Sequence, residues 1–111
     1  MVEKHVQRRL AAIMAADVVG YSRLMEMDEA GTFAALKEKR RNVVMPLVTQ
    51  HHGRIFKLMG DGVLVEFATA TDAVQCAIDV QRQFNQADLD KAPSERIILR
   101  IGINLGEVIL E

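Results

Sequence analysis

The segment that most constrains the fold of this chain is residues 54–67, in which two apolar runs flank the turn Gly60-Asp61-Gly62. Valine, isoleucine and phenylalanine favour strands, and a short Gly-Asp-Gly connection between two such runs is typical of a tight β-hairpin. An aspartate at a hairpin tip is usually structural, because its side chain tolerates turn dihedrals and bonds the nearby backbone. The segment therefore predicts a hairpin with a carboxylate at its tip.

A second aspartate is placed to join the first. Residues 10–19 are almost continuously apolar, which is typical of a central strand buried on both faces. Asp17 closes the apolar segment Leu10 to Ala16 within this run and leads into a Gly-containing turn at residues 18–21. Two aspartates at the ends of buried strands, one of them before a turn into a helix, suit a divalent metal site for nucleotide phosphates. The alternative of two unrelated turn aspartates stays open at this point.

Charge repulsion favours the metal interpretation. Two carboxylates ~4 Å apart repel by about 4 kcal/mol at an effective dielectric constant of ~20, and a cation between them removes that cost. Oxygen ligands select Mg²⁺ or Mn²⁺, and Mg²⁺ usually takes one or two protein carboxylates together with substrate phosphates. The turn before the helix would then offer backbone N–H groups to a polyphosphate. These turn residues are Val18, Val19, Gly20 and Tyr21.

The next segment predicts a long helix. Asp28 is a suitable N-cap, and Glu29 lies favourably in the first turn. Pro46 interrupts the helical pattern and should kink or break the helix, and Gly53 is a natural C-terminal cap. The expected buried stripe consists of Phe33, Leu36, Val43, Val44, Leu47, Val48 and His51.

The C-terminal half predicts a second amphipathic helix and two strands. The helix should begin at Thr71 or Asp72, and residues 85–94 should form a loop. Residues 96–104 alternate as a strand, residues 105–107 form a turn, and residues 108–110 begin another strand. The expected buried face of the helix consists of Ala73, Ala77, Val80 and Phe84. The fold class is therefore α+β, with helices on one face of a mainly antiparallel sheet.

The bulk composition is that of a soluble globular domain, with 111 residues, 50% of them hydrophobic and 26% charged. A net charge of -1 gives no general attraction to nucleic acid or to anionic membranes. Cys76 is the single cysteine, so no intramolecular disulfide forms, and we expect it to be a packing residue. No apolar run approaches the ~20 residues that span a bilayer. These features favour a cytoplasmic location.

Lys57 lies on the first strand of the hairpin, four residues before Asp61. Strand alternation predicts that it shares a face with Ile55 and Met59. A lysine there either extends toward solvent, or contacts a nucleotide base or phosphate, and spacing alone leaves these alternatives even.

Two other polar runs have better structural than functional explanations. Glu38 interrupts the basic run at residues 37–41, which we therefore expect to be a solvated helix face. His51 and His52 are adjacent and point apart at a helix end, and no acidic or cysteine partner is expected nearby, so a helix-terminal role is expected. The chain has no P-loop, no Ser-His-Asp order and no zinc-ligand spacing.

Three motifs in this order and spacing resemble the catalytic domain of class III nucleotidyl cyclases, the adenylate and guanylate cyclases, in their bacterial branch. The motifs are Ala-Asp-Val-Val-Gly-Tyr-Ser at residues 16–22, Lys-Leu-Met-Gly-Asp-Gly at 57–62 and Leu-Arg-Ile-Gly-Ile-Asn-Leu-Gly-Glu-Val at 99–108. The resemblance implies a ferredoxin-like, palm-type α+β fold. It makes residues 1–8 an N-terminal extension and residues 9–111 a partial catalytic domain.

The resemblance also implies an activity, the conversion of ATP or GTP into a 3′,5′-cyclic nucleotide and pyrophosphate. Asp17 and Asp61 match the family's metal-binding aspartates, which hold two Mg²⁺ or Mn²⁺ ions. Residues 18–21 and Gly60 match substrate-binding positions, and Lys57 matches the lysine that reads adenine. In the family the site forms between two head-to-tail catalytic domains, one giving the aspartates and the other the lysine. A homodimer is therefore implied.

One departure from the family limits the expected activity. The second base-reading residue and the asparagine and arginine that stabilise the transition state would all lie beyond Glu111. The chain therefore resembles the N-terminal half of the domain or somewhat more, and we expect it to be inactive alone. Three alternatives stay open: a guanylate cyclase, a palm-type diguanylate cyclase relative, and a degenerate nucleotide-binding or dimerisation module. The diguanylate cyclase would need a Gly-Gly-Asp/Glu-Glu-Phe hairpin, which differs from Gly60-Asp61-Gly62.

Overall fold

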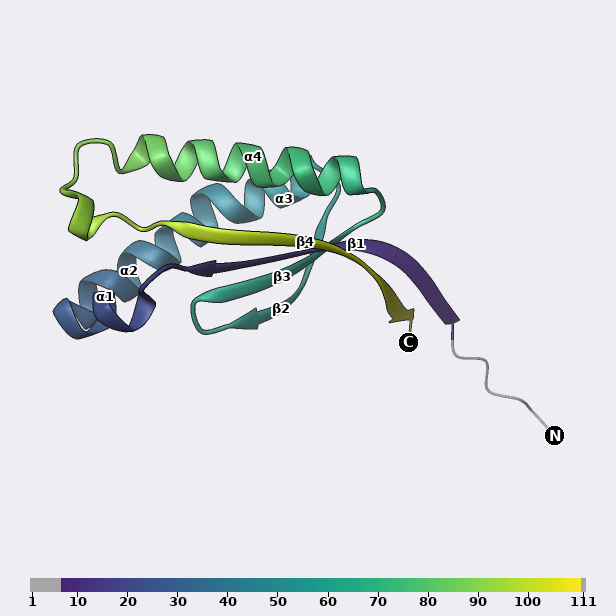
Figure 1. Cartoon of the computed structure of the whole chain (residues 1–111), viewed down its shortest axis with the longest axis horizontal. Coiled ribbons are helices and arrows are strands. Elements are labelled where there is room, and N and C mark those ends of the chain that lie inside the picture. The colour runs from purple at the N-terminus through teal and green to yellow at the C-terminus, as the bar shows by residue number, and fades with distance from the viewer. Residues whose placement is uncertain (1–6, 111) are drawn as a thin grey trace.

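The computed structural model describes residues 7–110, and its helices cover one face of a four-stranded sheet (Figure 1). The strands are β1 (Gln7–Val18), β2 (Arg54–Met59), β3 (Gly62–Phe67) and β4 (Leu99–Leu110). The helical elements are α1 (Tyr21–Met27), α2 (Glu29–Lys39), the π-helical turn η1 (Arg40–Val44), α3 (Met45–Gln50), α4 (Ala70–Ala87) and the 3₁₀ turn η2 (Pro93–Glu95). The predicted α+β class is confirmed. No helix in the described range is long and apolar enough to cross a membrane.

Strand β1 is the centre of the sheet. The strand order is β2-β3-β1-β4, and every neighbouring pair is antiparallel. Ala16 of β1 pairs with Val63 of β3 on one side and with Ile101 of β4 on the other. The continuous apolar run at residues 10–19 thus forms the central strand that it predicted, and β2 and β4 are left as the edges.

The hydrophobic core lies between the sheet and the helices. Alternate residues of β1 point into it, and Met14 at the middle of the strand is 1% exposed. The buried cluster consists of Ala12, Met14, Ala16, Val18, Leu24, Leu36, Val44, Leu47, Val48, Val63, Val65, Phe67, Ala73, Cys76, Val80, Phe84, Ile97 and Leu99. The opposite face of the sheet has no helix of the described chain over it (Figure 1).

The hairpin forms where it was predicted, with Gly60 and Asp61 as the two turn residues between the paired residues Met59 and Gly62. Gly60 has a φ of 47°, a left-handed conformation that glycine adopts without a Cβ clash. Asp61 therefore stands at the tip, one residue before β3 begins.

A β-bulge in β2 corrects the predicted orientation of Lys57. Ile55 pairs with Val65, whereas Lys57 pairs with Leu64, so Phe56 is the extra residue. Because paired residues share a face and neighbouring residues of β3 alternate, Lys57 lies on the face opposite to Ile55. The prediction that these two residues share a face was wrong, because the bulge interrupts the alternation.

The C-terminal strand also differs from the prediction. In place of a strand, a turn and a new strand, residues 99–110 form the single strand β4, paired with β1 along its whole length. The expected turn at residues 105–107 pairs with residues 10–12 of β1. Gly106 fits within the strand because the side chain of Ile13 approaches it closely; a Cβ there would lie 3.1 Å from Ile13 Cδ1. Pairing with a distant strand overrides the local turn signal.

The long predicted helix is present in three pieces. Asp28 caps α2 as expected, accepting a hydrogen bond from the Gly31 N–H at 3.0 Å. The stripe is buried at Leu36, Val44, Leu47 and Val48, but Phe33 is 60% exposed. The prediction for Phe33 was wrong because the start of α2 packs on α1 rather than over the sheet.

Helix α4 is longer than predicted. Its N-cap is Thr69, whose side chain accepts from the Asp72 N–H at 3.1 Å, and it continues to Ala87. The first three residues of the expected loop at 85–94 are therefore helical. Cys76 is fully buried, as expected of a packing residue.

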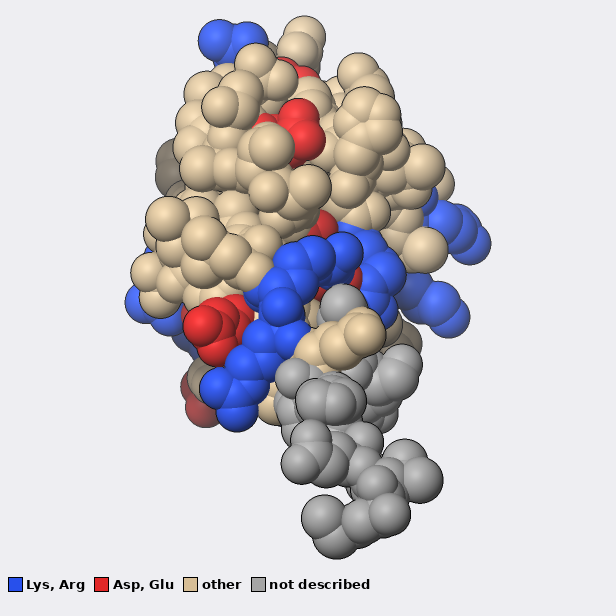
Figure 2. Space-filling model, turned by 90° about the vertical axis from the view of Figure 1, so that its right-hand side faces the viewer, with Lys and Arg blue, Asp and Glu red and all other residues tan. Residues whose placement is uncertain are grey.

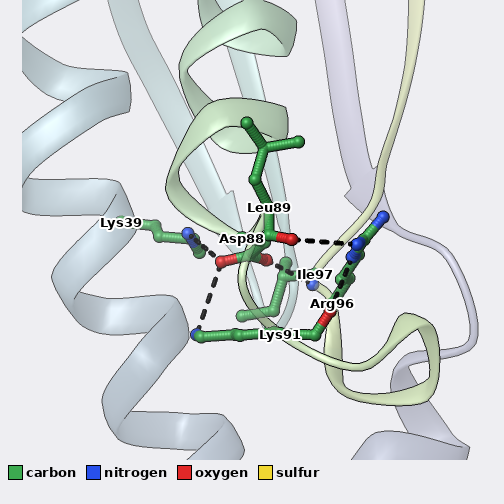
Figure 3. Close-up of polar contacts among 6 residues, drawn as sticks. All are labelled: Lys39, Asp88, Leu89, Lys91, Arg96 and Ile97. Carbon is green, nitrogen blue, oxygen red and sulfur yellow. Dashed lines mark hydrogen bonds and ion pairs between the residues drawn. The ribbon is translucent and has the colours of Figure 1, made fainter.

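Asp88, directly after α4, joins three segments of the chain (Figure 3). It is 1% exposed, and its Oδ2 accepts a hydrogen bond from the Ile97 N–H at 2.8 Å. Its Oδ1 lies 3.0 Å from Nζ of Lys39 on α2 and 3.3 Å from Nζ of Lys91. Lys39 is therefore buried, although residues 37–41 were expected to form a solvated face. The carboxylate links the ends of α2 and α4 to the segment that enters β4.

Burial by itself raises the pKa of Asp88. The Ile97 N–H and the ammonium groups of Lys39 and Lys91 outweigh it and hold the pKa below its ordinary value of 3.8. A carboxylate with a lowered native pKa stabilises the fold above its unfolded pKa, and this stabilisation disappears as the pH falls through the native pKa.

We predict that Asp88→Asn lowers the free energy of unfolding by about 3 kcal/mol at pH 7, because it leaves the buried Lys39 ammonium without its counterion. Urea denaturation measures the change. The difference from the unsubstituted chain should shrink as the pH falls from the unfolded pKa of Asp88 through its lowered native pKa, because protonation of the native carboxyl removes the stabilisation. Asp90→Asn, an exposed change in the same loop, is the control and should be neutral. Equal effects of the two changes would contradict the prediction.

Candidate functional site

Asp17 and Asp61 line the same groove at the end of β1. The groove has a volume of about 520 Å³. Asp17 is the penultimate residue of β1, and Asp61 reaches the groove from the hairpin tip. The lining residues are Ala15, Ala16, Asp17, Met59, Asp61, Gly62, Val63, Arg100, Ile101 and Gly102. The fold therefore brings together two carboxylates that are far apart in sequence.

The carboxylate of Asp61 is tied to the end of β1. Its Oδ2 accepts a hydrogen bond from the Val18 N–H at 3.1 Å. This bond joins the hairpin tip to the strand end that carries Asp17, and it leaves Oδ1 of Asp61 for other ligands. The β1–β3 pairing, which ends at Ala16 and Val63, sets up this contact.

Arg100 is the site residue that the sequence analysis missed. Its Nε donates to Asp17 Oδ1 at 3.0 Å and its Nη2 to Asp17 Oδ2 at 2.9 Å. The hydrogen bonds and charge of Asp17 raise the pKa of Arg100, and the charge of Asp61 adds to this. The alternation of residues 96–104 placed Arg100 on the polar side of a strand. Only the β1–β4 register, which sets Asp17 opposite Arg100, identifies the partner.

Two backbone N–H groups in the turn after β1 already have acceptors within the chain. The Val18 N–H binds Asp61, and the Val19 N–H donates to the Ile98 carbonyl at 2.8 Å. Gly20 adopts a left-handed φ of 66° at the start of α1. A phosphate at this turn would therefore meet the N–H groups of Gly20 and Tyr21 rather than those of the two valines.

Lys57 does not line the groove. It is exposed on edge strand β2 and lies on the same face of the sheet as Leu64. The described chain thus brings Asp17, Asp61 and Arg100 together and leaves Lys57 apart from them.

A metal ion at this groove would need ligands from outside the chain. Within residues 7–110, no three histidine, cysteine, aspartate or glutamate side chains could hold a metal ion by themselves. Two carboxylates in an open groove nevertheless fit Mg²⁺ or Mn²⁺, which complete their coordination with phosphate and water oxygens. Arg100 balances the charge of Asp17 and would have to share or release this carboxylate.

Two other reactive side chains have structural roles. His51 Nε2 lies 2.8 Å from Asp79 Oδ2 of α4, so the prediction that His51 has no acidic partner was wrong. The packing of α3 on α4 creates this contact between residues 28 apart in sequence. Burial, and then the charge of Asp79, raises the pKa of Cys76 to about 11, so its thiol is not poised as a nucleophile.

A second charged cluster lies at the far end of the sheet. Figure 2 shows lysine and arginine side chains gathered around acidic ones on this side of the molecule. The buried Glu66 accepts hydrogen bonds from Arg9 at 2.9 Å and from Arg54 at 2.5 Å. Burial by itself raises the pKa of Glu66, but the two guanidinium groups outweigh it and lower the pKa. The cluster fastens β1, β2 and β3 together.

Comparison with known proteins finds relatives of both nucleotide specificities. No protein-family model matches the chain. Over all 111 residues it is 50% identical to "Putative adenylate cyclase 3" of Rhizobium meliloti (strain 1021), and it spans 19% of that protein's length.

Two solved structures extend the comparison to the fold. An adenylate/guanylate cyclase/hydrolase from Silicibacter pomeroyi has a TM-score of 0.87 at 45% identity, covering 96% of this chain and 62% of its own. The guanylyl cyclase Cya2 has a TM-score of 0.74 at 28% identity, covering 94% of this chain and 57% of its own. These similarities therefore do not distinguish ATP from GTP as the nucleotide for this chain.

We predict that Gly62→Ala destabilises the fold by about 1–3 kcal/mol, because a Cβ there would lie 3.2 Å from the Ala16 carbonyl oxygen and 3.3 Å from that of Met59. Thermal or urea unfolding measures the loss. Gly102→Ala is the matched control on the other side of the groove, where a Cβ would meet nothing within 4 Å. A neutral Gly62→Ala, or an equal loss at Gly102, would show that the hairpin does not approach β1 this closely.

Proposed function

We propose that this chain, whose sequence and fold match those of class III adenylate/guanylate cyclase catalytic domains, is the metal- and phosphate-binding part of an adenylate cyclase. The whole enzyme would convert ATP into 3′,5′-cyclic AMP and pyrophosphate for intracellular signalling. The observation that carries the proposal is the convergence of Asp17, Asp61 and Arg100 on one groove at the end of β1. By itself the chain, as a partial domain, is proposed to be inactive.

Asp17 and Asp61 would hold two Mg²⁺ or Mn²⁺ ions through their carboxylate oxygens. Bound there, such ions lower the pKa of the ribose 3′-hydroxyl and stabilise the charge on the departing pyrophosphate. The chain's own contribution is to fix the carboxylates in advance. Asp61 is held by the Val18 N–H, and Asp17 is held by its pairing with Arg100 of β4.

Arg100 would bind the triphosphate. Its side chain is 73% exposed and already engages an anion with two parallel hydrogen bonds. A planar guanidinium suits phosphate as well as carboxylate. With cations bound to Asp17, Arg100 would be free to turn to the phosphates, and the N–H groups of Gly20 and Tyr21, in the turn after β1, would donate to them as well. Gly60, at the hairpin tip, completes the proposed substrate-binding set.

The adenine base would be read across a homodimer. Lys57 lies outside the groove of its own chain, which supports the family's arrangement in which a second chain supplies this lysine. Lysine has three donors and no acceptor, so it suits the N1 acceptor of adenine and not the protonated N1 of guanine. We place the enzyme in the cytoplasm, where ATP is supplied.

We predict that Asp17→Asn and Asp61→Asn each reduce cyclic AMP formation by the whole protein by about a hundredfold or more, because a neutral amide replaces a charged metal ligand. Turnover with Mg²⁺ and with Mn²⁺ measures the loss, and circular dichroism checks the fold. Asp90→Asn, exposed and distant in sequence, is the control with unchanged turnover. Wild-type turnover of either site variant with Mn²⁺ would refute the metal assignment.

We also predict that the whole protein uses ATP with a higher kcat/KM than GTP, and that Lys57→Glu shifts the ratio toward GTP. A carboxylate accepts hydrogen bonds from guanine N1 and N2, which a lysine cannot do. Lys37→Glu, the same charge change at an exposed position of α2, should leave the ratio unchanged. A clear preference of the unsubstituted protein for GTP would favour the guanylate cyclase alternative instead.

A further inference from the structure

The hairpin tip that carries Asp61 is bonded to the helical layer by one side chain. Arg40, the first residue of η1, donates from Nη2 to the carbonyl oxygen of Gly60 at 3.0 Å. Arg40 and Asp61 also line the same narrow gap between the helices and the sheet, whose other lining includes Val44 and Phe84. The basic run at residues 37–41 thus contains a residue that contacts the hairpin tip from the helical side of the sheet.

Packing alone does not fix this tip. A Cβ at Gly60 would meet no atom within 4 Å, and the preceding residues Leu58 and Met59 are 55% and 42% exposed. Within residues 7–110, two hydrogen bonds attach the tip beyond the β2–β3 ladder itself: Asp61 Oδ2 accepts from the Val18 N–H, and the Gly60 carbonyl accepts from Arg40. A tip held in this way can change its position when one bond is lost, without loss of the core.

The position of Arg40 follows from Pro46. Proline has no N–H to donate, and in a regular helix its ring would clash with the carbonyl of the residue four positions earlier. The helix accommodates Pro46 by forming the π turn η1, in which the Met45 N–H donates to the carbonyl of Arg40, five residues earlier. Pro46 then stands in the first turn of α3, where it is tolerated. The extra residue of such a turn changes which residues face a neighbour, and π turns are frequent at functional sites.

We propose that Arg40 is a positioning residue for the metal-binding carboxylate of Asp61. By holding the Gly60 carbonyl it fixes the rotation of the tip, and so the direction in which Asp61 presents its oxygens to the groove. The inference rests on the proposed function, since it assumes that Asp61 binds a metal ion. It adds a residue on the helical side of the sheet to a site otherwise built from strand ends.

The test is Mn²⁺ binding by the whole protein, followed by the electron paramagnetic resonance signal of free Mn²⁺, together with the Mn²⁺ concentration that half-activates turnover. Arg40→Ala should lower the Mn²⁺ affinity by about three- to tenfold and raise the half-activating Mn²⁺ concentration by the same factor. This is the loss expected for one hydrogen bond of ordinary strength. Turnover at saturating Mn²⁺ should change much less. Arg40→Lys, which keeps a charged donor, should restore part of the affinity.

Two controls separate positioning from general destabilisation. Arg41→Ala removes the neighbouring exposed arginine, and Val48→Ala removes core volume in α3 away from the groove. Both should keep the Mn²⁺ affinity of the unsubstituted protein, Val48→Ala in spite of a lowered melting temperature. If either control weakens Mn²⁺ binding as much as Arg40→Ala does, the positioning role is refuted.

Asp61→Asn distinguishes failure of this inference from failure of the proposed function. If Asp61→Asn binds Mn²⁺ as the unsubstituted protein does, or if neither binds it, the metal site itself is wrong and the role of Arg40 falls with it. If Asp61→Asn weakens binding and Arg40→Ala does not, the metal site stands and the positioning role alone is overturned.

Discussion

Every feature of the candidate site depends on the pairing of β1 with a strand on each side. Antiparallel pairing with β3 brings the hairpin tip beside the end of β1, where Asp61 accepts a hydrogen bond from the Val18 N–H. Antiparallel pairing with β4 sets Arg100 directly opposite Asp17. Because both ladders share one strand, a shift in either register would turn a charged side chain to the wrong face.

The few buried charges of the described residues fasten distant segments of the chain to one another. Asp88 joins α2, α4 and the entry to β4, and Glu66 joins the three strands at the far end of the sheet. Both carboxyls have lowered pKa values because their cationic and N–H partners outweigh the effect of burial. The Asp17–Arg100 pair differs, since it is exposed to solvent and can exchange partners at little cost in stability. This contrast separates charges that hold the fold from charges available to a ligand.

Sequence patterns over a few residues correctly predicted the features that local interactions determine. The hairpin at residues 54–67, the caps at Asp28 and the buried face of α4 were all foreseen, because turn dihedrals, capping bonds and helical periodicity act over a few residues. The errors arose where a distant segment decides the outcome. Residues 105–107 form a strand because β1 pairs with them, and Lys57 lies on the other face because of a bulge in β2. Lys39 is buried because it forms an ion pair with Asp88.

The sequence by itself determined the class of the fold, the two aspartates and the family that their spacing resembles. It did not identify Arg100 or Arg40. Each of them bonds a residue far along the chain, and no local sequence pattern indicates which residue that is. Only the tertiary structure decided that Asp17 faces a guanidinium across β1 and β4, and that a π turn sets Arg40 against the hairpin tip. The physical reason is that register and packing are settled by the whole sheet and its helices together, whereas turns and caps are settled by their own few residues.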